Sequence, residues 1–217
     1  MRKIIYIFVF TFLFNQELPN EVRWVRNSLE YKAICQQIYA YSTEKLEKYF
    51  LTNVDMNKNF AVIMDLDETV LDNSQYQVDL FNKNESFNME SWSTWVKKEE
   101  AKLVPGVYNY IQFLRNNNIQ VIFISNRMEV RIEETKNNLK KLDIYSEDDI
   151  YLLRRDKSDK KTKRREEVFL STGRMEPYNK FIVLQYLGDA MGDFESLNNI
   201  RFGIDQFIFP NPMYGKW

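Results

Sequence analysis

The chain has 217 residues, a net charge of −1 and 44% hydrophobic residues, enough for one domain with a substantial core. It has no histidine, which excludes histidine-nucleophile phosphatases, Ser-His-Asp hydrolases and histidine-ligated zinc sites. Its one cysteine, Cys35, excludes an intramolecular disulfide and any multi-cysteine metal site, and we expect it to be a small buried side chain.

Residues 1–16 have the pattern of a secretory signal peptide. Arg2 and Lys3 precede an apolar run, residues 4–14, that is interrupted only by Thr11 and is too short for an ordinary membrane span. An uncleaved membrane anchor is the alternative, since no A-x-A-like triplet follows. We therefore expect export to the periplasm, the cell surface or the medium, and a single domain over residues 17–217.

The segment 19–50 contains few helix breakers. Its large apolar side chains fall on one helical stripe, so we expect a long helix or a helix pair packed on the core. The stripe consists of Trp24, Tyr31, Ile34, Ile38 and Tyr49.

Residues 61–74, AVIMDLDETVLDNS, hold the main chemical signal. A short apolar run ends at Asp65, and Asp67 follows two residues later. Such a run is typical of a buried strand in a parallel sheet, and ligands bind at the carboxyl ends of such strands. Two close carboxylates repel each other, so a proton or a cation is expected between them. With only oxygen ligands nearby, Mg²⁺ is the expected cation.

An insertion and a second strand come next. Residues 76–104 include a helix-like piece with Trp92 and Trp95 three positions apart, and residues 107–116 predict a helix. The strand predicted over residues 120–124 ends in Ser125 and Asn126, whose hydroxyl and amide are suitable donors to a phosphate oxygen. A charged amphipathic helix is predicted over residues 130–142.

Three further strands are predicted over residues 150–153, 181–187 and 207–209. The first leads into a basic run, residues 154–165, which by itself indicates either a solvated helix face or a nucleic-acid patch. The near-zero net charge and the absence of a second basic cluster argue against nucleic acid. The next strand ends in Gly188 and Asp189, with Asp193 close behind. Two more carboxylates are thus predicted at a strand end.

Taken together, these motifs resemble the class C acid phosphatases and 5′-nucleotidases of the lipoprotein e family, in the haloacid dehalogenase (HAD) superfamily. The matching strings are DLDETVLDNS, SNR, DKSDK, GDxxxD and the terminal segments EVRWVRNSLEYKA and PNPMYGKW. The resemblance covers nearly all of residues 20–217. It implies an α/β fold with a Rossmann-like parallel sheet flanked by helices, N-terminal helices and a small helical cap inserted at about residues 76–104. No cysteine follows the apolar run, so the family's lipid anchor is not supported.

The resemblance also implies a mechanism. Asp65 would be the nucleophile that forms an aspartyl-phosphate, and Asp67 would be the general acid and base. Mg²⁺ would be held by the carboxylate of Asp65, the backbone carbonyl of Asp67 and the carboxylate of Asp189. Asp193 would orient a metal-bound water from the second shell.

The same resemblance assigns the substrate contacts. Ser125, Asn126 and Lys160 would bind the phosphate, and the neighbouring Lys157 and Lys161 match the motif less well. Aromatic residues would face the leaving group: Tyr76, Trp92 and Tyr214. This favours a small, nucleotide-like phosphomonoester such as a nucleoside monophosphate, including nicotinamide mononucleotide. A homodimer is expected by resemblance alone.

Two other functions fit part of the sequence. DLDET also occurs in protein phosphatases that act on phosphoserine tails, although the VLDNS continuation and the predicted export signal argue against them. A catalytically silent storage or phosphate-binding relative would be expected to lack the nucleophile or a metal ligand, whereas Asp65, Asp67, Asp189 and Lys160 are all present.

Overall fold

The computed structural model describes residues 17–52, 58–195, 197 and 201–215. The predicted signal peptide lies outside the described residues. In the described part of the chain, no helix is both long and apolar enough to cross a membrane.

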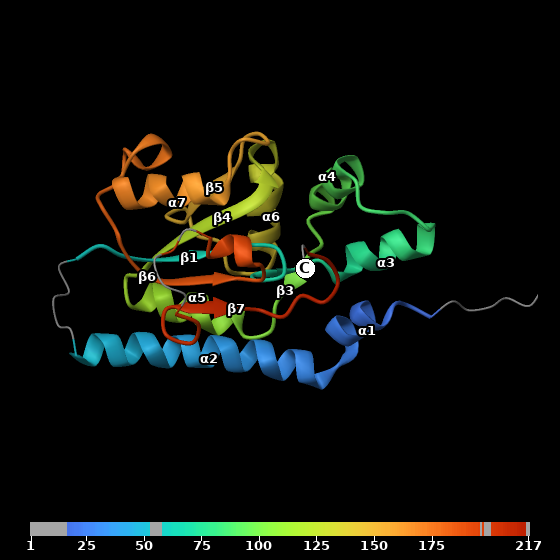
Figure 1. Cartoon of the computed structure of the whole chain (residues 1–217), viewed down its shortest axis with the longest axis horizontal. Helices are drawn as coiled ribbons and strands as arrows, with labels where there is room; N and C mark the ends of the chain where they lie inside the picture. Colours follow the sequence, from blue (N-terminus) through green and yellow to red (C-terminus); the bar gives the residue numbers. More distant parts are fainter. Residues whose placement is uncertain (1–16, 53–57, 196, 198–200, 216–217) are drawn as a thin grey trace, which may run out of the picture.

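A five-stranded parallel sheet forms the centre of the molecule (Figure 1). Its strands are ordered β5–β4–β1–β6–β7. Their bounds are β1 Phe60–Met64, β4 Gln120–Met128, β5 Ile150–Arg154, β6 Ile182–Gly188 and β7 Gln206–Ile208. All five run in one direction, so their carboxyl ends, and the polar residues that follow them, meet at one edge.

Both faces of the sheet are covered by helices, which explains why β1 is apolar at every position. Val62 and Met64 belong to the core on the side of α2 (Leu29–Thr52) and α5 (Val107–Asn116). Ala61 and Ile63 belong to the core on the side of α7 (Lys161–Leu170). Figure 1 shows α7 above the sheet and α2 and α5 below it.

The insertion between β1 and α5 forms a helix pair on a two-stranded base. β2 (Leu71–Asp72) and β3 (Lys102–Leu103) pair antiparallel, and α3 (Ser74–Lys83) and α4 (Met89–Lys98) lie between them in the chain. The pair projects to the right of the sheet in Figure 1. The proposed cap at about residues 76–104 corresponds to these elements.

The N-terminal segment differs from the single stripe expected. Ser28 has an extended backbone and separates α1 (Asn20–Asn27) from α2, and its hydroxyl accepts a hydrogen bond from the Tyr31 backbone N–H at 3.0 Å. The break rotates the stripe, and Ile34 is exposed although it was expected to pack inward. Cys35 is fully buried, as expected.

Two other predicted boundaries shift. β4 continues through the polar triplet after Ile124 as far as Met128, with an irregular register, because this stretch still pairs with β5. The helix predicted over residues 130–142 divides into a 3₁₀ turn, η1 (Glu129–Arg131), and α6 (Ile132–Lys141).

Candidate active site

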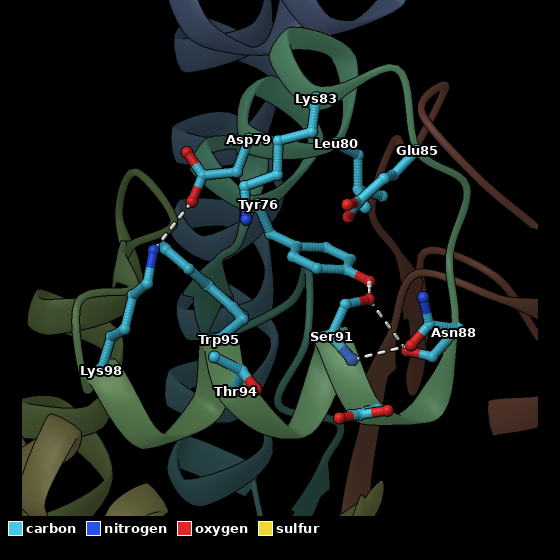
Figure 2. A pocket seen from close by; sticks show the side chains of 11 residues that line it. Tyr76, Asp79, Leu80, Lys83, Glu85, Asn88, Ser91, Thr94, Trp95 and Lys98 are labelled. Atoms are coloured by element: carbon cyan, nitrogen blue, oxygen red, sulfur yellow. Dashed lines mark hydrogen bonds and ion pairs between the residues drawn. The ribbon is translucent and has the colours of Figure 1, made fainter.

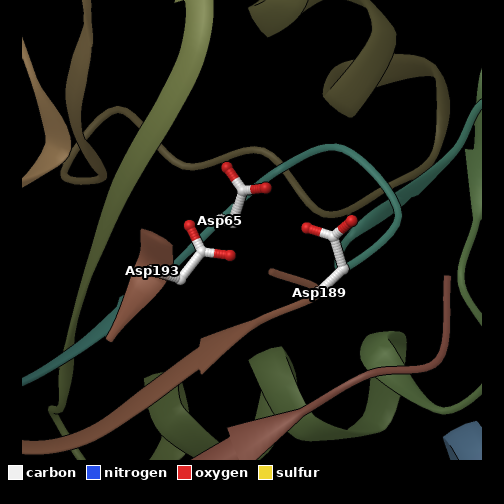
Figure 3. Close-up of side chains that lie close together, drawn as sticks. All are labelled: Asp65, Asp189 and Asp193. Carbon is white, nitrogen blue, oxygen red and sulfur yellow. The ribbon is translucent and has the colours of Figure 1, made fainter. Parts of the chain in front are cut away.

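Three carboxylates from three separate segments gather at the carboxyl edge of the sheet (Figure 3). Asp65 follows β1, Asp189 follows β6, and Asp193 lies in the 3₁₀ turn η3 (Met191–Asp193). An oxygen from each lies within 4.8 Å of the others. Asp65 is only 6% exposed, and its backbone N–H is held by the carbonyl of Leu187 at 2.9 Å.

The environment disfavours three charges in one place. Burial raises the pKa of Asp65 well above its usual range, and the nearby carboxylates raise it further against the opposing effect of Lys161. Burial, together with Asp193, raises the pKa of Asp189 to about 6. Oδ1 of Asp65 is buried and takes part in no hydrogen bond. An oxygen-only donor set with a buried carboxylate oxygen free of hydrogen bonds fits a hard divalent cation.

Lys161 supplies positive charge to this cluster. Its ammonium lies 2.6 Å from Oδ1 of Asp65 and also forms an ion pair with Asp193. Burial alone would lower the pKa of Lys161, but the two carboxylates outweigh it and the pKa is raised. The structure therefore corrects the expected register of this motif. Lys160, the residue that matched best, is exposed and is the residue that precedes α7.

Asp67 points to a different set of partners from the other three aspartates. Its Oδ1 accepts hydrogen bonds from Arg127 Nε at 2.9 Å and from Asn73 Nδ2 at 2.9 Å. The hydroxyl of Ser125 lies 3.5 Å from Oδ2. The carboxylate is thus outside the acidic cluster, which leaves the backbone carbonyl as the group of Asp67 for a metal, as the resemblance implied.

The second predicted phosphate-binding stretch is positioned by buried arginines. Ser125 is fully buried, whereas Asn126 is exposed. Arg164, also fully buried, donates to Asn126 Oδ1 at 2.8 Å and to the carbonyls of Ser125 and Leu152. Arg164 thereby ties the ends of β4 and β5 to α7. Sequence reasoning did not identify Arg127 or Arg164; the only available signal was an arginine directly after Ser125-Asn126.

The three predicted substrate aromatics lie in different surroundings. Tyr76 is 3% exposed and its hydroxyl bonds with Ser91 Oγ at 2.8 Å, so it is part of the helix pair rather than an open platform. Trp92 is partly buried and meets the Tyr76 ring edge-on, with centroids 5.1 Å apart. Tyr214 is half-buried in the C-terminal segment. That segment reaches the acidic cluster through Asn211, whose Nδ2 donates to Asp189 at 2.7 Å.

A polar cavity of about 300 Å³ opens between α3 and α4 (Figure 2). Tyr76 and Trp95 form part of its wall, and an ion pair between Lys98 and Asp79, 2.9 Å long, crosses one side. No aspartate of the acidic cluster lines it. The cavity is therefore a feature of the helix pair and not the place where the carboxylates meet.

Gly188 leaves the space that Asp193 occupies. A Cβ at position 188 would lie 2.3 Å from Asp193 Oδ2 and 2.4 Å from its Cβ, closer than real contacts allow. Gly188→Ala should displace Asp193, destabilise the fold by about 1–3 kcal/mol and weaken divalent-metal binding about 10–100-fold. Thermal unfolding with and without metal measures both effects.

Gly192→Ala is the matched control for that variant, because a Cβ there would meet nothing within 4 Å. It should leave both the unfolding temperature and its metal-dependent shift close to wild type. Equal behaviour of the two variants would contradict the close packing of Gly188 against Asp193.

Known proteins share this fold and sequence. A family model described as HAD superfamily, subfamily IIIB (acid phosphatase) matches residues 10–217. The class C acid phosphatase of Bacillus anthracis with tungstate bound is 27% identical, with a TM-score of 0.77, covering 90% of this chain and 84% of that chain. A second structure of that enzyme gives 28% identity and a TM-score of 0.76 over the same shares.

A stem 31 kDa glycoprotein of Glycine max is 25% identical over 188 residues, which cover 84% of this chain and 66% of that protein. The chain thus spans slightly less than two thirds of the soybean relative. The family model, by contrast, takes in the N-terminal helices, the sheet and every motif at its carboxyl edge. The chain therefore belongs to subfamily IIIB of the HAD superfamily, the acid phosphatases, and has the α/β fold of their class C members.

Proposed function

We propose that the chain is an exported, Mg²⁺-dependent phosphomonoesterase that acts on nucleoside monophosphates, including nicotinamide mononucleotide, through an aspartyl-phosphate. The observation that carries the proposal is the pairing of Asp65 with Lys161 inside a cluster of buried carboxylates. A nucleophile needs a group that holds the incoming phosphate against the cluster's negative charge, and Lys161 stands beside Asp65 to do so. Tungstate, bound by the Bacillus anthracis relative, is a tetrahedral oxyanion like phosphate.

Asp65, Asp189 and the backbone carbonyl of Asp67 would hold Mg²⁺, with Asp193 beside them. The ion would offset charge on the phosphoryl oxygens and keep Asp65 ionised. Asp65 attacks phosphorus while the bond from phosphorus to the ester oxygen breaks. Asp67 gives its proton to the departing oxygen and then takes a proton from the water that releases phosphate from Asp65.

Ser125, Asn126 and Lys161 would contact the remaining phosphate oxygens. Ser125 is well placed, since its hydroxyl already lies at the edge of Asp67. Lys161 replaces Lys160 in this role because Lys161 alone of the two reaches Asp65. The exposed amide of Asn126 is fixed by Arg164.

The leaving group would meet the aromatics of the helix pair and the C-terminal segment. Trp92, with its partly exposed ring, and Tyr214 are the candidates for stacking on a base, a contact worth about 1–3 kcal/mol per base. Tyr76 would act indirectly, since its ring supports Trp92. We propose a small phosphomonoester rather than a nucleic-acid polymer as the substrate, and a homodimer as the assembly.

Phosphate release from a substrate panel tests the proposal. The panel contains nucleoside 5′-monophosphates, nicotinamide mononucleotide, p-nitrophenyl phosphate and a phosphoserine peptide, each with Mg²⁺ and with EDTA. We expect release from the nucleotides that EDTA abolishes and Mg²⁺ restores. Release from the peptide alone would assign the chain to the protein phosphatases, and release from none would favour a silent phosphate-binding relative.

A further inference from the structure

Arg127 is a buried cation that the proposed chemistry does not yet use. It lies in β4 two residues after Ser125 and is 1% exposed. Its Nη1 donates to Thr135 Oγ1 at 3.3 Å and its Nη2 donates to Asn73 Oδ1 at 3.3 Å. Its remaining donors point at Asp67, so the whole guanidinium is committed to fixed partners.

The contacts on Asp67 are unequal between its two oxygens. Oδ1 lies 2.9 Å from Arg127 Nε, 2.8 Å from Arg127 Nη2 and 2.9 Å from Asn73 Nδ2. Oδ2 has only the hydroxyl of Ser125, at 3.5 Å. Three donors therefore saturate Oδ1, because a carboxylate oxygen has about two lone-pair sites, while Oδ2 keeps its capacity for a proton.

The same guanidinium also supports the helix pair. Its carbon lies 5.8 Å from the centre of the Trp92 ring, within range of a cation–π contact. Asn73 accepts a further hydrogen bond from Trp95 Nε1 at 2.8 Å. Arg127 and Asn73 thus join the carboxylate of Asp67 to the two tryptophans of α4.

We propose that Arg127 is the positioning residue of the general acid: with Asn73 it occupies Oδ1 of Asp67, so that Oδ2 is the oxygen that gives the proton to the leaving group and later takes one from water. The inference rests on the proposed function. It assigns a task to a residue that does not touch the reacting atoms and specifies which oxygen of Asp67 moves the proton.

The test uses two leaving groups of different basicity. Protonation matters greatly for the alkoxide released from a nucleoside 5′-monophosphate and little for p-nitrophenolate, which leaves without a proton. We expect Arg127→Ala to lower kcat on the order of 10²-fold for the nucleotide and by less than about tenfold for p-nitrophenyl phosphate. Free guanidinium ion should restore part of the nucleotide rate.

Arg115→Ala is the matched control. It removes a part-buried arginine that forms a 2.9 Å ion pair with the buried Asp149, near the start of β5 and away from the aspartate cluster. It should lower the unfolding temperature without separating the two substrates. Arg127→Lys keeps the charge but not the fork of donors, so it should lose the nucleotide rate selectively even if Arg127→Ala does not fold.

A double-variant measurement completes the test. In the Asp67→Asn background, Arg127→Lys should cost little more, because the group that it positions is already disabled. Equal losses on both substrates, or additive losses with Asp67→Asn, would overturn the inference while leaving the proposed function intact. A wild-type chain that hydrolyses neither substrate would overturn both.

Discussion

Asp65→Asn should abolish phosphate release from every monoester, with kcat reduced by at least about 10³-fold. The substitution keeps the shape of a side chain that is 6% exposed but removes the anionic oxygen that attacks phosphorus. It also removes one charge from a crowded set of carboxylates, so the unfolding temperature should hold or rise in metal-free buffer. Acid-quenched incubation with radiolabelled phosphoester should label the wild-type chain and not the variant.

Asp189→Asn provides the comparison for that result. It removes a carboxylate of the same cluster but leaves Asp65 in place, so residual labelling at raised Mg²⁺ concentration is expected. Wild-type turnover by Asp65→Asn would show that another group attacks phosphorus.

Lys161→Ala should lower kcat/KM on the order of 10²–10³-fold, as expected when one preorganised charge at a reacting oxyanion is lost. The ammonium pairs with both Asp65 and Asp193 and is almost entirely buried, so its removal leaves carboxylates without their cation. Such a loss costs about 3–5 kcal/mol for a buried pair. In EDTA the unfolding temperature should fall markedly, and Mg²⁺ should restore much of it by supplying positive charge to the same carboxylates.

Lys160→Ala is the matched control, since it removes a neighbouring lysine that is exposed and distant from Asp65 in its contacts. Its activity and its unfolding temperature should stay near wild type. A larger loss in Lys160→Ala than in Lys161→Ala would restore the register expected from the motif and contradict the ion pair seen here.

The predictable part of the site is the part that parallel strands determine. Asp65, Ser125 and Asp189 each follow an apolar run, and the carboxyl ends of parallel strands share one edge, so their convergence needed no knowledge of distant contacts. The lysine was misplaced by one residue because motif spacing does not determine where a helix begins. α7 begins at Lys161, and the extended backbone of the residue before it turns that side chain outward.

The arginines escaped prediction for a different reason. Arg127 is 60 residues from Asp67, and Arg164 is 38 residues from Asn126, so neither partnership leaves a local pattern. A strand that reads as polar and exposed at this point instead buries a charged side chain, which is stable only because each donor finds an acceptor. Tyr76 was expected at an open mouth, but the hydroxyl bond to Ser91 turns it inward.

The hydrogen bonds at Asn73 limit how the helix pair can evolve or be exchanged. β2 and β3 offer a short, regular ribbon at which a foreign insertion could be spliced in. Yet Asn73, just beyond that splice point, binds the carboxylate of Asp67 with its nitrogen and Trp95 of α4 with its oxygen. A transplanted cap without an equivalent indole N–H would leave that buried amide oxygen with one donor fewer and loosen the acid. Changes of substrate range in such proteins should therefore arise by point replacements within α3 and α4 more readily than by wholesale cap replacement.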